Sequence, residues 1–342
     1  MPRPIRRGLL AGGNWIIDHV KLIDGWPPQD SLATILSQSS SNGGAPYNVL
    51  KNLSRLGVPY PLSAIGLVGT DVNGRNILAD CRDHGIDPAQ LRSTPDAATS
   101  YTDVMTVVGT GRRTFFHQPG ANALLGPEHF DFTATTAKLF HLGYLLLLPR
   151  LDAAGADGRP CAADVLRRAR RAGLRTSLDF VSENSDRFQT LAATVLPHVD
   201  CLFVNDFEAE KLTGVSLRPG GVLDSRAVVQ AGRKLIGGGV RSWVVVHFPE
   251  AVYACSAAGT GLWQPSVRVP PAEIAGAVGA GDALAAGVLH GLHEEWSMAE
   301  CLRLGVCVAA ASLSHPTCSE GVRPLADCLV LGDQVGFRPL PA

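Results

Sequence analysis

The chain has 342 residues, of which 46% are hydrophobic and 18% are charged, and its formal net charge is -1. This length accommodates one large α/β domain or two smaller ones, and the composition is that of a globular protein with a sizeable core. Because the charges nearly cancel and form no large basic cluster, neither nucleic acid nor an anionic membrane is expected as the main partner.

The cysteines and the apolar segments predict a soluble, cytoplasmic protein. The eight cysteines include no C-x-x-C pair and no metal-ligand spacing, so we expect them to be reduced core thiols. The N-terminal stretch "MPRPIRRGLLAGGNWIID" starts like a signal peptide, but Gly12, Gly13 and Asn14 shorten its apolar run, which we interpret as a first strand. The apolar segment 139–149 has about half the length of a membrane-spanning helix.

Short apolar runs alternate with helical patterns along the chain, which is typical of parallel strands joined by crossover helices. Several of the helical patterns end in glycine at or near the C′ position, which is a helix-stop signal. Strands are predicted at 8–13, 62–68, 139–148, 174–180, 200–205 and 242–248. Helices are predicted at 46–57, 74–85, 161–173, 208–214, 225–239, 281–292 and 297–314.

Two stretches interrupt this alternation and predict a small separate sheet. Residues 20–42 and 99–117 read as strands rich in Thr, Val and Phe, and the second resembles a hairpin that turns at Gly109-Thr110-Gly111. Strands inserted into an α/β chain commonly cover a site. We therefore predict a lid, with strands within about 14–42 and 99–118, and no long linker divides the chain into halves.

Two glycine-rich loops precede helices in the first quarter of the chain. In "NGGAPYNVLKNLSRLG", Gly43 and Gly44 let a ligand approach the backbone, and Asn48 offers both a donor and an acceptor. A plain turn before a helix is the alternative interpretation. In "AIGLVGTDVNGRNI", Asp71 either contacts a ligand or stabilises the turn.

The stretch "GAGDALAAGVL" begins with Gly279, Ala280 and Gly281 at the start of a predicted helix. Free N–H groups and the helix dipole make such a start a site for an anion. Asp282 would then lie beside a bound phosphate, the arrangement of a general base that activates a hydroxyl toward a γ-phosphoryl group. The alternative is that Asp282 is the N-cap of the helix. No G-x-x-x-x-G-K-[ST] motif occurs, which excludes Walker-type NTPases.

The stretch "LFVNDFEAEKLTG" places Asn205 and Glu208 three residues apart at a strand-to-helix junction. Both side chains can face a crevice at the carboxyl end of the strand, where oxygen ligands suit Mg²⁺ held directly or through water. The alternative is structural, with Asn205 capping the helix and Glu208 completing a capping box.

In this order and spacing, the motifs resemble those of the ribokinase-like family of sugar kinases, also called the PfkB family, from about residue 9 to about 325. The stretch "GGNWIIDHV" resembles the first strand of the family, whose acid, here Asp18, binds sugar hydroxyls. "NGGAPYNVLKNLSRLG" resembles the first family motif, in which Gly43, Gly44 and Asn48 contact substrate. "IGLVGTDVNGRNI" is similar to the G-x-V-G-x-D-x-x-G segment that follows it.

The resemblance also implies a reaction. "NDFE" is similar to the N-x-x-E motif that the family links to magnesium and phosphate, so Asn205 and Glu208 would hold Mg²⁺ through water. "GAGD" is similar to the core of the second motif, in which Asp282 would be the catalytic base and residues 279–281 the anion hole. A sugar hydroxyl, expected to be a primary one, would attack the γ-phosphate of ATP while Asp282 removes its proton.

The resemblance further implies a single domain over residues 1–342 with a three-layer ribokinase-like fold, a mostly parallel central sheet flanked by helices and a small β-sheet lid. The lid would exclude water, and Arg113, His117 and Asn122, on the path from the lid to the main domain, are predicted substrate contacts. Arg113 would pair with a substrate carboxylate or phosphate, or remain a solvated lid charge. Lid strands of this family often pair between subunits, so a homodimer is expected.

The sequence departs from the family pattern at two places. The second motif commonly reads D-T-x-G-A-G-D, whereas Gly276-Ala277-Val278 precede "GAGD" here; the missing acid and threonine help to bind a monovalent cation in many relatives, which argues against potassium activation. His247 stands where a small polar or basic residue of the nucleotide site is usual, which predicts an altered nucleotide pocket.

These departures leave two alternatives to a sugar kinase. One is a catalytically silent relative that binds a sugar or sugar phosphate as a sensor or scaffold. The other is a nucleoside kinase on the same fold. The retention of Asp282 and Asn205 favours a kinase over the silent relative, because a decayed site would be expected to lose these residues first. The nucleoside kinase differs only in its substrate, and the polar segment "GRRTFFHQPGAN" favours a sugar, one that could bear an anionic group.

Overall fold

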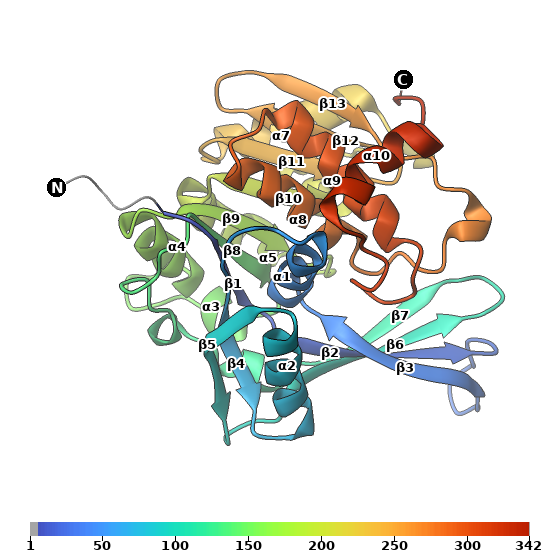
Figure 1. Cartoon of the computed structure of the whole chain (residues 1–342), viewed down its shortest axis with the longest axis horizontal. Coiled ribbons are helices and arrows are strands. Elements are labelled where there is room, and N and C mark those ends of the chain that lie inside the picture. The colour runs from blue at the N-terminus through green and yellow to red at the C-terminus, as the bar shows by residue number, and fades with distance from the viewer. Residues whose placement is uncertain (1–5, 342) are drawn as a thin grey trace.

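The computed structural model describes residues 6–341 and is built on one central nine-stranded sheet (Figure 1). The strand order is β13-β12-β11-β10-β9-β8-β1-β4-β5, and all neighbours are parallel except β11 with β12 and β12 with β13. The strands are β1 (Leu9–Gly13), β4 (Leu62–Gly69), β5 (Ile86–Thr94), β8 (Leu139–Leu145), β9 (Arg175–Phe180), β10 (Cys201–Asn205), β11 (Trp243–His247), β12 (Ala251–Ser256) and β13 (Gly261–Pro265).

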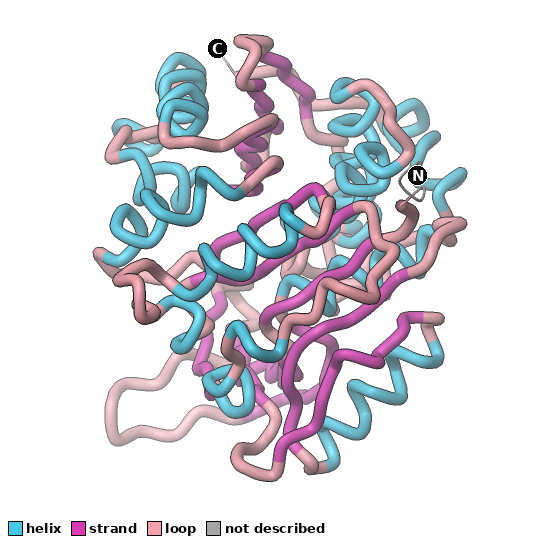
Figure 2. The backbone as a smooth tube through the Cα atoms, turned by 90° about the vertical axis from the view of Figure 1, so that its left-hand side faces the viewer, coloured by secondary structure: helices cyan, strands magenta, loops and turns pink. Residues whose placement is uncertain are grey.

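Helices lie on both sides of this sheet (Figure 2). One face packs on α1 (Ala45–Leu56), α2 (Val72–Asp83), α8 (Ala280–His293), α9 (Met298–Ser312) and α10 (Leu325–Val335). The other face packs on α3 (Pro149–Asp152), α4 (Cys161–Arg171), α5 (Arg187–Val195), α6 (Asp206–Thr213) and α7 (Ser225–Gly237). Short 3-10 helices are η1 (Gly120–Leu124), η2 (Pro127–His129), η3 (Leu196–His198), η4 (Pro219–Gly221) and η5 (Pro271–Glu273). Two hydrophobic cores, one on each face, explain why the parallel strands are almost continuously apolar. The predicted three-layer arrangement is confirmed.

A second, four-stranded sheet projects away from the main sheet and forms the predicted lid (Figure 1). Its order is β3-β2-β6-β7, in which β2 and β6 are parallel and the outer pairings are antiparallel. The strands are β2 (Ile16–Ile23), β3 (Ile35–Gly43), β6 (Ser100–Val107) and β7 (Arg113–Gln118). The hairpin predicted around residues 109–111 is the β6–β7 connection.

The sequence missed β5, β12, β13, α5 and α10, and it extended β8 too far. Strand β5 is an edge strand that contains Pro88 and has many exposed positions, so it lacks the apolar run of a central strand. Strand β8 ends at Leu145 because Leu146 adopts a φ of 78° and turns the chain, although the leucines beyond it stay mostly buried.

Two further observations concern the whole chain. All eight cysteines are free thiols, and all except Cys161 are buried. Within residues 6–341, the helices fall short of the length and apolarity that a bilayer crossing requires.

Candidate active site

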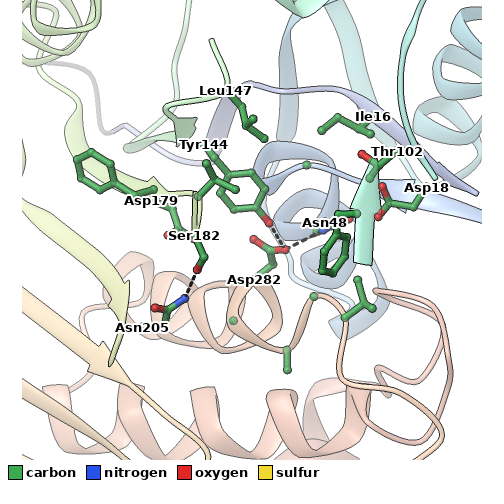
Figure 3. Close-up of a pocket in the computed structure, with 18 of the residues that line it drawn as sticks. Ile16, Asp18, Asn48, Thr102, Tyr144, Leu147, Asp179, Ser182, Asn205 and Asp282 are labelled. Carbon is green, nitrogen blue, oxygen red and sulfur yellow. Dashed lines mark hydrogen bonds between the residues drawn. The ribbon is translucent and has the colours of Figure 1, made fainter. Parts of the chain in front are cut away.

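The carboxyl ends of the central strands meet the N-terminus of α8 at one cavity of about 470 Å³, which the lid borders (Figure 3). Such a crevice at the carboxyl end of a parallel sheet is the usual position of a ligand site. The cavity collects polar side chains from distant parts of the chain. Those predicted from the sequence that line it are Asp18, Asn48, Arg113, His117, Asn205, Glu208, His247 and Asp282, together with the backbone of Gly44 and of residues 279–281.

Asp282 is the best-defined carboxylate of the cavity. It is 3% exposed, and its Oδ2 accepts hydrogen bonds from Asn48 Nδ2 at 2.7 Å and from the Tyr144 hydroxyl at 2.6 Å (Figure 3). Its Oδ1 has no hydrogen-bond partner among the described residues. Burial raises the pKa of Asp282 to about 6, and the two donors oppose this rise. The N-cap of α8 is Gly279, so the capping alternative for Asp282 is wrong.

The start of α8 requires glycine at two positions. Gly279 has a φ of 74°, and a Cβ there would lie 2.7 Å from Cβ of Cys318. A Cβ on Gly281 would lie 3.0 Å from Cε1 of His247. Because the first helical amides have no intrahelical acceptor, this helix start next to Asp282 has the arrangement of an anion site.

Asn205 and Glu208 form the capping box of α6 and also line the cavity. Asn205 Oδ1 accepts from Glu208 N at 2.9 Å, and Glu208 Oε2 accepts from Asn205 N at 2.9 Å. The hydroxyl of Ser182 donates to Glu208 Oε1 at 2.7 Å. Burial raises the pKa of Glu208 to about 7, and these hydrogen bonds oppose the rise. The capping-box interpretation is therefore confirmed. It is compatible with the other interpretation, a role in Mg²⁺ binding, because both side chains also line the cavity.

Sequence reasoning missed Asp179 and Tyr144. Asp179 is 5% exposed at the carboxyl end of β9, and burial together with Glu208 and Asp282 raises its pKa well above the ordinary value. An acid inside an apolar strand pattern was a readable signal for Asp179. Tyr144 carried no such signal, because it lies within the most apolar run of the chain.

On the lid side, Asp18 of β2, Thr102 of β6 and His117 of β7 form one row across the sheet. Burial raises the pKa of Asp18 to about 7, and a hydrogen bond from Thr102 opposes the rise. His117 Nδ1 lies 3.0 Å from Thr102 Oγ1, while its Nε2 is buried without a partner among the described residues. Burial lowers the pKa of His117, so the ring is neutral near pH 7.

Three predicted residues take other positions. A Cβ on Gly43 would lie 2.5 Å from the Asp18 carboxylate, so Gly43 gives Asp18 its space. Asn122 is fully buried and binds the backbone N and O of Trp15, both at 3.2 Å, so its amide supports the chain before β2 and does not line the cavity. Asp71 caps α2 through Gly74 N at 2.8 Å, which confirms the turn-stabilising role.

A second cavity of about 420 Å³ lies against the same helix start and has a largely apolar wall. The two cavities share Asn205, His247, Ala277, Ala280 and Gly281, so the N-terminus of α8 and His247 stand at their junction. Burial lowers the pKa of His247 to about 4, which keeps its ring neutral. The two cavities therefore meet at the start of α8, next to Asp282.

Comparison with known proteins defines the class to which this arrangement belongs. Residues 11–324 match the pfkB family of carbohydrate kinases. This match covers most of the chain, and the protein therefore belongs to that family and is a phosphotransferase that acts on a hydroxyl group.

Individual relatives are distant. The chain is 28% identical over 299 residues to probable fructokinase-7 of Arabidopsis thaliana, which covers 84% of this chain and 79% of the relative. It is 32% identical over 211 residues to an ATP-dependent ribose-1-phosphate kinase of Halopiger xanaduensis, which covers 60% of this chain and 64% of the relative. The ribokinase of Thermotoga maritima has the same fold, with a TM-score of 0.77 at 18% identity over 96% of this chain and 99% of that one.

Proposed function

We propose that the protein phosphorylates a sugar or sugar-derivative hydroxyl with ATP and that Asp282 is the general base. The observation that supports the proposal is the hydrogen bonding of the Asp282 carboxylate: two donors hold Oδ2, and in the part of the chain that the structure describes Oδ1 has no partner. Solved relatives of the same fold include an Arabidopsis ribokinase complexed with ribose and ATP and a Xylella fastidiosa fructokinase with bound ATP.

In this mechanism the substrate hydroxyl donates its hydrogen bond to Asp282 Oδ1. The oxygen of the substrate hydroxyl attacks the γ-phosphorus as the bond to the ADP leaving group breaks, and the proton of that hydroxyl passes to Asp282 Oδ1. The amides of Gly279, Ala280 and Gly281 hold the charge of the transferring group. Asp18 and His117 accept from other sugar hydroxyls, and the lid excludes water that would otherwise compete for the phosphate.

The second cavity is the proposed nucleotide site. Its apolar wall suits a base, and its junction with the first cavity directs the phosphates to the α8 start. His247 would contact the phosphates there as a neutral donor, unlike the charged or small polar residue expected from the family pattern.

Asp179, Asn205 and Glu208 fit a hydrated Mg²⁺ ion. All three line the cavity, and burial raises the pKa values of Asp179 and Glu208. Repulsion adds to the rise, from Glu208 and Asp282 for Asp179 and from Asp282 for Glu208, and a cation would offset this cost. The described residues contain no cluster of three or more His, Cys, Asp or Glu that could hold an ion directly, which favours contact through water. Mg²⁺ would supply charge neutralisation for the phosphates.

Two proposals concern the cellular form. The lid exposes apolar side chains on β3 and nearby, which supports the homodimer expected from the sequence. The free thiols support the cytoplasmic location.

The decisive experiment measures ATP-dependent phosphorylation over a panel of sugars and nucleosides for the wild type and for Asp282→Asn. We expect kcat to fall by about 10²–10⁴-fold or more, because the amide cannot accept the proton. Asp83→Asn, an exposed residue of α2, is the matched control and should behave as wild type. Undiminished turnover by Asp282→Asn would refute the base, and sugar-induced stabilisation without any effect of ATP and Mg²⁺ would favour the silent sensor.

A further inference from the structure

We propose that the sugar substrate carries an anionic group, either a carboxylate or a phosphate, and that Arg113 of the lid binds it. This inference rests on the kinase function proposed above and narrows its substrate class. It depends on the position of Arg113 on the lid, on the absence of a carboxylate partner for it, and on the distribution of charge in the rest of the cavity.

The alternation of strand β7 turns Arg113 toward the cavity. Side chains of a strand alternate between its two faces, and Arg113, Phe115 and His117 all line the cavity. The intervening Phe116 faces the other side, where it stacks on Trp26 with ring centroids 6.1 Å apart. Arg113 therefore belongs to the inner face of the lid and is not one of its solvated outer charges.

Arg113 is a partly buried cation that has no hydrogen-bonding or ionic side-chain partner within residues 6–341. Burial lowers the pKa of its guanidinium, and among the described residues no carboxylate opposes this effect. Arg218 shows the contrast, because it is also partly buried and pairs with Asp206 at 2.6 Å and Glu250 at 2.8 Å. A guanidinium that loses water without gaining an anion is destabilised, and a ligand anion in the cavity would reverse that cost.

The neighbouring row of the lid is already complementary to neutral hydroxyls. His117 Nδ1 lies 3.0 Å from Thr102 Oγ1, and its Nε2 is buried without a partner among the described residues. The Asp18 carboxylate and the neutral His117 ring therefore offer partners to hydroxyls. Arg113 offers donors in a planar fork that matches a carboxylate or a phosphate and adds little for a hydroxyl.

Two features of the cavity attract an anion: Arg113 on β7 and the start of α8. The proposed mechanism assigns the start of α8 to the transferring phosphate, so an anionic group of the sugar is left with Arg113. Asp18, Asp179, Glu208 and Asp282 also line the cavity, and each repels an anion when it is ionised. An anionic sugar is therefore oriented by Arg113. Its neutral end, which carries the hydroxyl to be phosphorylated, is directed toward Asp282.

The test compares matched neutral and anionic substrates: D-glucose with D-gluconate for the carboxylate, and D-ribose with D-ribose 1-phosphate for the phosphate. Calorimetry without nucleotide measures binding, and steady-state kinetics with ATP and Mg²⁺ measures kcat/KM. For at least one pair we expect the anionic member to be preferred by about tenfold or more. Arg113→Ala should reduce that preference by about 10- to 100-fold, and Arg113→Lys by less, because lysine keeps the charge but loses the fork. Arg112→Ala, the exposed neighbour, should leave it unchanged.

The outcomes separate this inference from the proposed function. Neutral sugars that are phosphorylated as well as their anionic partners, with Arg113→Ala matching Arg112→Ala, would overturn the anion site and leave the kinase intact. Binding of an anion that depends on Arg113 but is followed by no phosphorylation of any substrate would support the anion site and count against the kinase. Failure of both anions to bind the wild type would overturn the inference.

Discussion

At the scale of single residues, the Tyr144 hydroxyl helps to hold the Asp282 carboxylate in place and lowers its pKa. The Tyr144 hydroxyl and Asn48 donate to the same carboxylate oxygen, which fixes the carboxylate, and the other oxygen has no partner among the described residues. Burial and Asp282 raise the pKa of Tyr144 well above its ordinary value, so the phenol keeps its proton and remains a donor. The phenol therefore stabilises the charged form of Asp282 and positions it.

Tyr144→Phe should move the acidic limb of the kcat/KM profile to higher pH. In the proposed mechanism Asp282 acts as a base only when it is deprotonated, so we expect wild-type activity to fall as the pH drops through the Asp282 pKa of about 6. The Tyr144 hydrogen bond lowers this pKa, and its loss should raise the limb by roughly one pH unit. At pH values above this limb, Tyr144→Phe should lower kcat by a smaller factor than it does on the limb.

The matched control is Tyr60→Phe, which removes the hydroxyl of another buried tyrosine. This hydroxyl lies 3.1 Å from His290 Nδ1, and Tyr60 does not line the cavity. Tyr60→Phe should cost stability without moving the limb. A pH profile of Tyr144→Phe that coincides with that of Tyr60→Phe would show that Tyr144 has no positioning role.

Cavity residues that stand in recognisable motifs could be predicted from the sequence. Those that only tertiary packing brings to the cavity were missed. Asp282 and Asn48 stand in glycine-rich motifs, but their mutual hydrogen bond across 234 residues is visible only in the fold. Gly276 is a departure that packing explains, because a Cβ there would lie 2.9 Å from Cα of Pro316. Asn122 was predicted to contact substrate, but its amide is bound to the backbone N and O of Trp15 and does not line the cavity.

At the scale of elements, the contact between α8 and α9 fixes the position of α8, whose first turn is the proposed anion site. A Cβ on Gly287 of α8 would lie 2.8 Å from Cα of Gly305 of α9, so the two helices touch backbone to backbone. Asp282 lies in the first turn of α8. A change in the spacing between α8 and α9 should therefore alter both the free energy of unfolding and the activity.

Gly287→Ala should lower the free energy of unfolding by about 1–3 kcal/mol, because the added methyl forces the helices apart, and it should raise KM for ATP. Chemical denaturation and steady-state kinetics measure the two effects. Gly237→Ala, at the end of α7 with no atom within 4 Å of the added Cβ, is the control and should be neutral or slightly stabilising. Equal stability of the two variants would contradict the close helix contact.

The elements that the sequence identified are those with strong periodicity and clear ends. Central strands and helices that stop at Gly57 or Gly214, both in the left-handed conformation, were predicted within a few residues. The edge strands of the main sheet, β5 and β13, have many exposed or half-buried positions, so their sequences lack the apolar run of a central strand. Their pairing depends on neighbours far along the chain, which local periodicity does not encode.

At the scale of the whole molecule, the lid both borders the cavity and presents a surface to the outside. Strand β3 lies at one edge of this sheet, and among the described residues it pairs only with β2, which leaves its outer edge unpaired. Ile35 and Leu36 on β3 are 50% and 57% exposed. An unpaired edge next to exposed apolar side chains favours association with a second copy of the same sheet.

We therefore expect the protein to sediment as a dimer and Leu36→Glu to shift it toward the monomer, because the substitution places a charge in the apolar contact. Val222→Glu, which alters a side chain that is 74% exposed in the loop between α6 and α7, is the matched control and should remain dimeric. Sedimentation over a range of concentrations measures the equilibrium. If the lid pairs between subunits, the monomeric variant should also have a raised KM for the sugar, since β2 of the same sheet carries Asp18 into the cavity. A wild type that is monomeric at all concentrations would refute the dimer, and an unchanged KM in a monomeric Leu36→Glu would show that each lid works alone.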